Sequence, residues 1–166
     1  IRLLPCEKAK SEIGFYSAAE YTLDRLICND KKSLEISRAC VDKDYRQGIS
    51  LHLLWTGMAK YVLSRNINLL FGVASFQGND VSTISSALTL LSKKYSAPKS
   101  LGFRAKEFGY IDMNIVPIRK LDQNKALTQM PSLLKAYLRM GAKIADGAFR
   151  DTEFNTIDVG LMMLTE

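Results

Sequence analysis

Three side chains that could act on an amino group lie within four residues of one another: Glu35, Ser37 and Arg38. Apolar residues alternate with polar ones across 34–41, which predicts a strand. Side chains alternate along a strand, so Glu35 and Ser37 are expected on the same face. A partly desolvated carboxylate is a candidate general base, and a guanidinium such as Arg38 can bind a carboxylate through two hydrogen bonds. The segment could therefore take up a proton and bind a carboxylate.

Each of these side chains also has a purely structural interpretation. Glu35 could pair with Arg38 or face solvent, and the spacing alone favours this over catalysis. Ser37 could be satisfied by neighbouring backbone, and Arg38 could pair with Asp42. Cys40 has no nearby base and is read as a small core residue.

A basic turn follows this strand and leads into a helix. Apolar residues recur at three- and four-residue steps from Ser50 onward, which predicts a helix over 50–65. The first N–H groups of a helix have no partner, and its dipole favours negative charge. We therefore expect an anion at Arg46, Gln47, Gly48, Ile49 and Ser50. A solvated basic turn is the alternative.

The composition limits the class of protein. A chain of 166 residues with 47% apolar residues suits one globular domain spanning 1–166, and no window is long and apolar enough for a membrane span. Cys6, Cys28 and Cys40 contain no C-x-x-C pair, which argues against a disulfide framework or a metal site and suits a cytoplasmic location. The net charge of +6 predicts an acidic partner or an anionic membrane surface. No motif supports nucleic-acid binding.

The remaining pattern predicts a mixed α/β fold. A near-continuous apolar run over 67–76 suits a buried central strand, and Pro131 and Gly141 are placed to bound a helix. Asp146-Gly147 predicts a tight hairpin, and 157–164 a last strand.

Five segments together resemble one protein family. They are EISRACVD at 35–42, YRQGI at 45–49, LFGVASF at 70–76, PSLLKAYLRMG at 131–141 and FNTIDV at 154–159. The set resembles the acyl-carrier-protein-dependent branch of the GNAT N-acyltransferases. This branch holds the ornithine-lipid N-acyltransferases (the hemolysin-like acyltransferase group), the N-acyl amino acid synthases and the acyl-homoserine-lactone synthases. The resemblance implies a largely antiparallel central sheet flanked by helices. It also implies a strand and helices before the residue matching Ile1, which this chain lacks.

The resemblance assigns roles to particular residues. Glu35 would take the amine proton, directly or through water, Ser37 would assist it, and Arg38 would bind the acceptor's carboxylate. The turn at 46–50 would hold the phosphate of a phosphopantetheine arm, with further contacts from Val73 and Ser75. Three aromatic residues would line an acyl pocket, although core packing is the alternative for each: Trp55, Phe71 and Phe76.

The turn departs from the usual GNAT phosphate-loop pattern, Arg/Gln-x-x-Gly-x-Gly/Ala. Tyr45 and Ser50 stand at its two ends. This weakens the case for a coenzyme A pyrophosphate and suits a carrier-bound arm with a single phosphodiester. We therefore expect the acyl-phosphopantetheine of acyl carrier protein as donor, with acyl-CoA as an alternative and no bound cofactor.

The reaction implied is transfer of a fatty or 3-hydroxy-fatty acyl group from acyl carrier protein to the α-amine of ornithine, giving a lyso-ornithine lipid. Two alternatives stay open. The acceptor could be another amino acid, or S-adenosylmethionine as in the homoserine-lactone synthases. The domain could instead bind acyl carrier protein without catalysis. A cytoplasmic location is expected, with peripheral contact to the inner face of the membrane as a further expectation.

Overall fold

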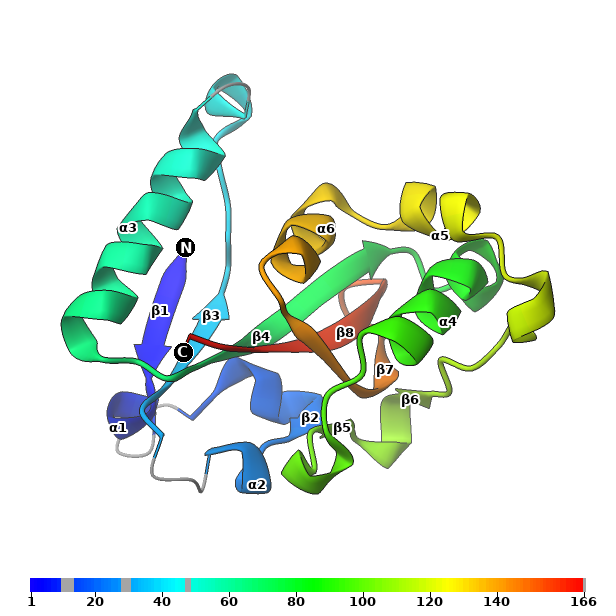
Figure 1. The fold of residues 1–166 in the computed structure, drawn as a ribbon, viewed down its shortest axis with the longest axis horizontal. Helices are drawn as coiled ribbons and strands as arrows, with labels where there is room; N and C mark the ends of the chain where they lie inside the picture. Colours follow the sequence, from blue (N-terminus) through cyan, green and yellow to red (C-terminus); the bar gives the residue numbers. More distant parts are fainter. Residues whose placement is uncertain (10–13, 28–30, 47–48, 166) are drawn as a thin grey trace.

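The computed structural model describes residues 1–9, 14–27, 31–46 and 49–165. Its centre is a curled sheet with the strand order β1-β3-β4-β8-β7-β5-β2, and β6 pairs with β7 off this path (Figure 1). The β3–β4 and β5–β7 pairs are parallel, and the other ladders are antiparallel. The strands are β1 (Arg2–Pro5), β2 (Tyr21–Thr22), β3 (Ser33–Ser37), β4 (Leu69–Gln77), β5 (Arg104–Ala105), β6 (Tyr110–Ile111), β7 (Lys143–Asp151) and β8 (Thr156–Leu164).

Helices cover one face of this sheet. They are α3 (Ser50–Arg65), α4 (Ser85–Lys94), α5 (Gln123–Gln129) and α6 (Ser132–Arg139). Even-numbered residues of β4 point toward them: Leu70 packs with Met58 of α3, and Phe76 packs with Leu88 of α4. A strand buried in this way explains the continuous apolar run in the sequence.

The opposite face is covered by the segment 14–27 and by β5. This segment contains a 3-10 helix at Tyr16–Ala19, strand β2 and the short helix α2 (Asp24–Ile27); the short helix α1 (Cys6–Lys8) follows β1. Odd-numbered residues of β4 point into this second core, where Phe71 packs against Phe15 with ring centroids 5.0 Å apart. The two faces of β4 therefore pack into different cores.

The central feature of the sheet is the place where β3 and β4 part. Their parallel ladder runs only from Ser33–Leu69 to Ile36–Gly72, after which β4 continues beside β8 to Gln77. Gly72 marks the last pair, since a Cβ atom there would lie 2.3 Å from the carbonyl oxygen of Ile36. Arg38 then turns the chain away with φ of 51°.

Several sequence expectations are confirmed. The α/β fold is as predicted, α3 spans 50–65, and Asn66 ends it in the left-handed conformation with φ of 52°. Pro131, expected as the first residue of a helix, is the N-cap of α6. Among the described residues no helix is long and apolar enough to cross a bilayer.

Three expectations need correction. Cys40, read from the sequence as a core residue, is exposed, because it follows the point where the chain leaves the sheet. The strand predicted over 34–41 ends at Ser37, because the chain leaves the sheet at Arg38. The hairpin predicted at Asp146-Gly147 is wrong, since β7 runs through both residues. Gly147 has φ of 77°, the pairing register shifts between Ile144 and Ala148, and the turn comes later, between β7 and β8. The Asp-Gly pair here marks a bulge rather than a hairpin.

Candidate functional site

A cleft of 390 Å³ occupies the opening between β3 and β4. It runs from the helical face of the sheet, where Leu133 and Tyr137 of α6 line it, to the opposite face, where Tyr16 and Asp158 line it. The walls between are the end of β3 and residues 73–75 of β4. The parting of two parallel strands thus makes a passage through the sheet.

Four residues predicted from the sequence meet in this cleft: Ser37, Arg38, Val73 and Ser75. The buried Ser37 Oγ has no hydrogen-bond partner within the described part of the chain. The guanidinium of Arg38 lies over the ring of Tyr16, with Cζ 5.5 Å from the ring centroid. Both side chains therefore keep polar groups at the wall of the cleft.

Glu35 lies on the same strand but does not line the cleft. It is fully buried, and its Oε1 accepts hydrogen bonds from Ser17 N at 2.7 Å and Ser17 Oγ at 2.8 Å. Its Oε2 accepts from Tyr16 N at 3.1 Å and from the Arg2 guanidinium at 3.2 Å. The ion pair is thus made with Arg2 rather than with Arg38. The carboxylate joins β1, β3 and the 3-10 helix at Tyr16–Ala19, and its role as a base stays a prediction.

The expected anion site at the start of α3 is described only in part, because Gln47 and Gly48 lie outside the described residues. Arg46 donates from Nε to the carbonyl of Val41 at 2.9 Å and is exposed. Ile49 is 63% exposed, and Ser50 opens the helix. No side chain among the described residues caps the N-terminus of α3. Phosphate binding at this turn stays a prediction.

The three aromatic residues predicted for an acyl pocket have different surroundings. Trp55 is half-buried and packs against Tyr137, with centroids 4.9 Å apart, beside the helical end of the cleft. Phe71 lines a small apolar crevice that shares Ile36, Val73 and Tyr137 with the cleft. Phe76 is 2% exposed and packs under α4. For Phe76 the core alternative fits the structure, because its even position on β4 points it at that helix.

The opposite end of the cleft holds acidic residues that the sequence analysis did not select. Carboxylate oxygens of Glu20, Asp151 and Asp158 all lie within 4.8 Å of one another. Glu20 and Asp158 are 4% and 3% exposed. No donor in the described structure reaches Glu20 Oε2 or Asp158 Oδ1. These three carboxylates are the described group able to hold a cation.

Burial and like charges perturb this group. Burial, then the charges of Asp158 and Asp151, raises the pKa of Glu20 from 4.5 to about 8. Burial also raises the pKa of Asp158, opposed by the hydroxyl of Ser75. An Asp in the apolar run TIDVGLMML of β8 was the signal available in the sequence.

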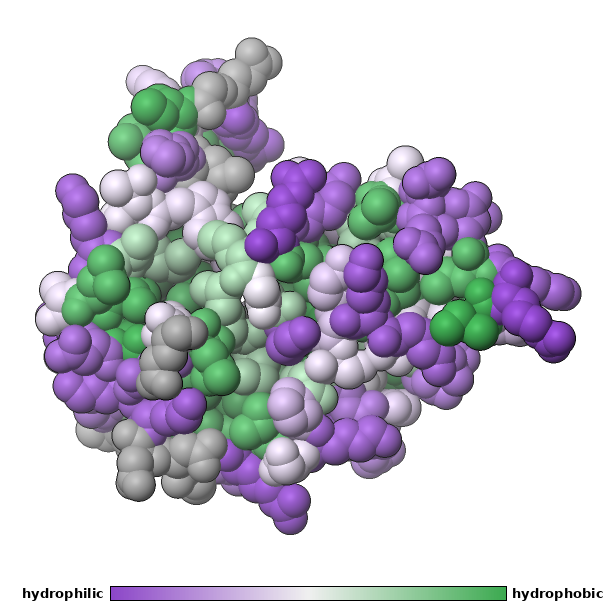
Figure 2. Space-filling model, in the orientation of Figure 1, coloured by the Kyte–Doolittle hydropathy of each residue, from purple (hydrophilic) through white to green (hydrophobic). Residues whose placement is uncertain are grey.

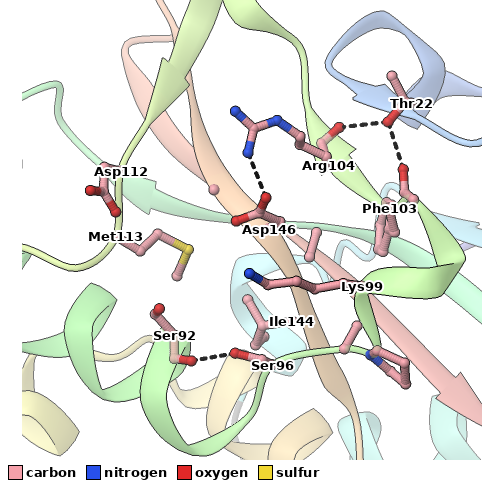
Figure 3. A pocket seen from close by; sticks show the side chains of 15 residues that line it. Thr22, Ser92, Ser96, Lys99, Phe103, Arg104, Asp112, Met113, Ile144 and Asp146 are labelled. Carbon is pink, nitrogen blue, oxygen red and sulfur yellow. Dashed lines mark hydrogen bonds and ion pairs between the residues drawn. The ribbon is translucent and has the colours of Figure 1, made fainter.

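A separate pocket of 210 Å³ lies at the β5–β7 edge and shares no lining residue with the cleft (Figure 3). One of its charged residues, Arg104, pairs with Asp146 at 2.5 Å and with the neighbouring Glu107 at 3.1 Å. The guanidinium also lies 4.1 Å from the ring centroid of Tyr110. These hydrogen bonds raise the pKa of Arg104. These contacts give the Arg104 cluster a structural explanation that needs no ligand.

A central sheet in which two parallel strands separate around a through-going cleft defines a GNAT-type domain. The family model for the acetyltransferase (GNAT) domain matches residues 1–56, which include β3 and the start of α3. This part of the chain is thus similar to that family. No solved structure matches it.

Individual curated relatives of the chain share one enzyme name. The chain is 45% identical to an L-ornithine N(alpha)-acyltransferase of Rhodobacter capsulatus, over 99% of the chain and 63% of the relative. It is 36% identical to the enzymes of the same name from Brucella abortus, over 99% and 59%, and Agrobacterium fabrum, over 95% and 55%. The chain thus spans about three-fifths of the length of these relatives.

Proposed function

We propose that this chain carries the acyl-transfer site of an N-acyltransferase that moves a fatty or 3-hydroxy-fatty acyl group from acyl carrier protein to the α-amine of ornithine. The product would be a lyso-ornithine lipid. The observation that carries the proposal is the cleft through the sheet where β3 and β4 part. The identity of 34–45% to L-ornithine N(alpha)-acyltransferases supports the choice of acceptor.

The two ends of the cleft suit the two substrates. The apolar surface of Trp55 and Tyr137 lies toward its helical end, and Trp55 is carried by α3, which begins at Ser50. A phosphorylated arm and an acyl chain fit there, because a helix N-terminus attracts anions and a chain needs apolar walls. The acidic end suits an amino acid that carries two ammonium groups. Donor and acceptor would thus meet inside the sheet from opposite faces.

The thioester would be held by the edge of β4 that β3 leaves. Beyond Gly72 this edge has no partner strand within the described sheet, so those N–H groups of 73–75 that do not point to β8 are available to a carbonyl or an amide. Backbone donors fixed in a strand stabilise a developing oxyanion without rearrangement. Ser37 would add a hydroxyl from the facing wall, and Arg38 would bind the acceptor's carboxylate.

The amine must lose a proton before it attacks the thioester carbon. Asp158 is the carboxylate that lines the cleft, and its raised pKa makes it a stronger base than an ordinary aspartate. We therefore assign proton transfer to Asp158. Glu35, whose four lone-pair positions are occupied, would act by positioning the segment that carries Tyr16.

A mass-spectrometric product screen tests this function. The full-length protein would be mixed with a 3-hydroxyacyl carrier protein or the matching acyl-CoA and a pool of amino acids. N-acyl-ornithine formed from the carrier-bound donor is the expected product. Another N-acyl amino acid would move the acceptor and keep the reaction. Intact thioester with every acceptor would contradict the proposal and favour a binding module.

The proposed acyl donor also implies where in the cell the protein works. An enzyme that uses acyl carrier protein works in the cytoplasm, and a lipid product would be delivered to the inner face of the membrane. Sedimentation of the protein with anionic vesicles, compared with neutral ones, would test the peripheral contact.

A further inference from the structure

A second cavity, of 440 Å³, adjoins the acidic end of the cleft. The two spaces share Tyr16 and Phe154 in their linings. Aromatic rings form much of its wall, from Phe108, Tyr110 and Phe149. The acidic residues in its lining are Glu20, Asp151 and Glu153. Asp158 lines the adjoining cleft, and its carboxylate lies within 4.8 Å of those of Glu20 and Asp151.

Acidic residues outnumber basic ones in the lining of this cavity. Arg150, the cation among the described lining residues, donates to the carbonyl of Asn79 at 3.0 Å. The groups that act most strongly on Glu20 are Asp158 and Asp151, both acidic. Asp151 Oδ1 is occupied by the N–H groups of Glu153 and Phe154, at 2.8 and 3.0 Å, so the turn fixes it in place. Glu20 Oε2 stays without a donor among the described residues, although the side chain is 4% exposed. Burial of such a group costs free energy unless a ligand satisfies it.

A cation with an apolar stem would satisfy both features of the cavity. Carboxylates pair with an ammonium group, and aromatic faces attract a cation and pack against methylene groups. A hydrated divalent metal ion would use the carboxylates but not the rings. The cavity continues from the cleft in which the α-amine would react, so a side chain leading from that amine can enter it.

We propose that Glu20 and Asp151, with Asp158 at their junction, bind the side-chain ammonium of a diamino-acid acceptor and so select ornithine over neutral amino acids. This inference rests on the proposed acyl transfer. It assigns specificity to the cavity, whereas the proton transfer assigned to Asp158 concerns every acceptor. Loss of the specificity role should change the preference between acceptors, whereas loss of proton transfer should lower kcat for every acceptor.

The test compares ornithine with norvaline, which has the same carbon chain without the side-chain amine. We expect the wild-type full-length protein to favour ornithine in kcat/KM by at least about 100-fold. Glu20→Gln should lower this ratio by about 30-fold or more, mainly through KM for ornithine, and leave norvaline unchanged. Glu107→Gln, whose partner Arg104 lines the pocket of Figure 3, is the control and should change neither. An unchanged ratio in Glu20→Gln, with the variant folded, would overturn the inference.

Direct binding separates this inference from the proposed function. Calorimetric titration with ornithine and with norvaline needs no thioester, so it works even if the product screen fails. Ornithine should bind wild type more tightly than Glu20→Gln, and norvaline should bind both equally. A parallel titration with Mg²⁺ or Mn²⁺ alone should give no heat that depends on Glu20. Metal binding lost in Glu20→Gln, without loss of ornithine binding, would identify a metal site and overturn the ammonium assignment.

Discussion

Two buried carboxylates, those of Glu35 and Glu20, lie at the two ends of the segment 14–20, and they differ in how many hydrogen bonds they accept. At one end, Glu35 accepts four hydrogen bonds, two of them from backbone N–H groups of Tyr16 and Ser17. At the other end, Glu20 faces two further acidic residues and keeps an oxygen without a donor in the described structure. The carboxylate of Glu35 thus has a full set of donors, whereas that of Glu20 does not. Hydrogen-bond satisfaction, rather than burial, distinguishes a structural acid from a candidate functional one.

Charged groups on the surface and charged groups inside the sheet differ in their access to water. Figure 2 shows hydrophilic side chains spread over much of the visible face, with hydrophobic ones gathered between α3 and α6. Exposed charges such as Arg104 and Glu107 find partners at little cost in water. Charges buried inside the sheet are not solvated by water, so each must be paired by another protein group or by a ligand.

The largest expected effect comes from the carboxylate in the cleft. Asp158→Asn keeps the shape but cannot accept a proton, so we expect kcat to fall by about 10²–10⁴-fold for every acceptor. Steady-state rates with ornithine and norvaline would measure it. Glu35→Gln should retain more activity than Asp158→Asn in the same assay. If Glu35→Gln loses activity while Asp158→Asn keeps it, the base is Glu35, as the sequence resemblance implies.

The second effect concerns the satisfied carboxylate. Glu35→Ala removes the acceptor of four donors and leaves Arg2 without its partner, so we expect a loss of about 3–5 kcal/mol in the free energy of unfolding. Denaturant titration would measure this loss. Glu35→Gln keeps one acceptor oxygen and should lose less. Equal stability of Glu35→Ala and wild type would show that the network does not support the fold.

The third effect is a dependence on pH. The pKa of Glu20 is raised from 4.5 to about 8, so between these values the folded state keeps a proton that the unfolded state has lost. Stability should therefore fall as pH rises from about 4.5 to 8, by up to a few kcal/mol. Asp158, Asp151, Tyr16 and Tyr21 also face this group and remain in both proteins.

Glu20→Gln isolates the contribution of Glu20 to this slope. The variant should be more stable than wild type at pH 8 and nearly equal to it at pH 4.5. Thermal melts across this range, without ligand, would measure the difference. Parallel curves for the two proteins would mean that Glu20 is ionised at neutral pH in the folded state.

The smallest effect belongs to the exposed cluster in the pocket of Figure 3. Asp146→Asn breaks the pair with Arg104, which keeps Glu107 and the ring of Tyr110. We expect a loss of about 1 kcal/mol or less, reduced further by salt, and unchanged transfer kinetics. A loss as large as that of Glu35→Ala, or a change in acceptor choice, would give this pocket a function that its internal pairing argues against.

The sequence by itself determined the elements that depend on local patterns. The periodicity of apolar residues located α3, Asn66 ended it, and the apolar run located β4. The short motif around Ser37 and Arg38, together with the LFGVASF run, located two walls of the cleft. Period and turn chemistry are properties of neighbouring residues, so they can be recognised without the fold.

Only the tertiary structure decided which charged groups meet. Arg2 and Glu35 are 33 residues apart, and Glu20 and Asp158 come from opposite ends of the chain. The sequence offered Arg38 as the partner of Glu35 because it was near, but the positive φ at Arg38 turns it away into the cleft. Asp146-Gly147 likewise became a bulge, because β8 continues alongside it. Pairing between distant strands sets the surroundings of each carboxylate, and those surroundings divide the structural acid from the candidate functional ones.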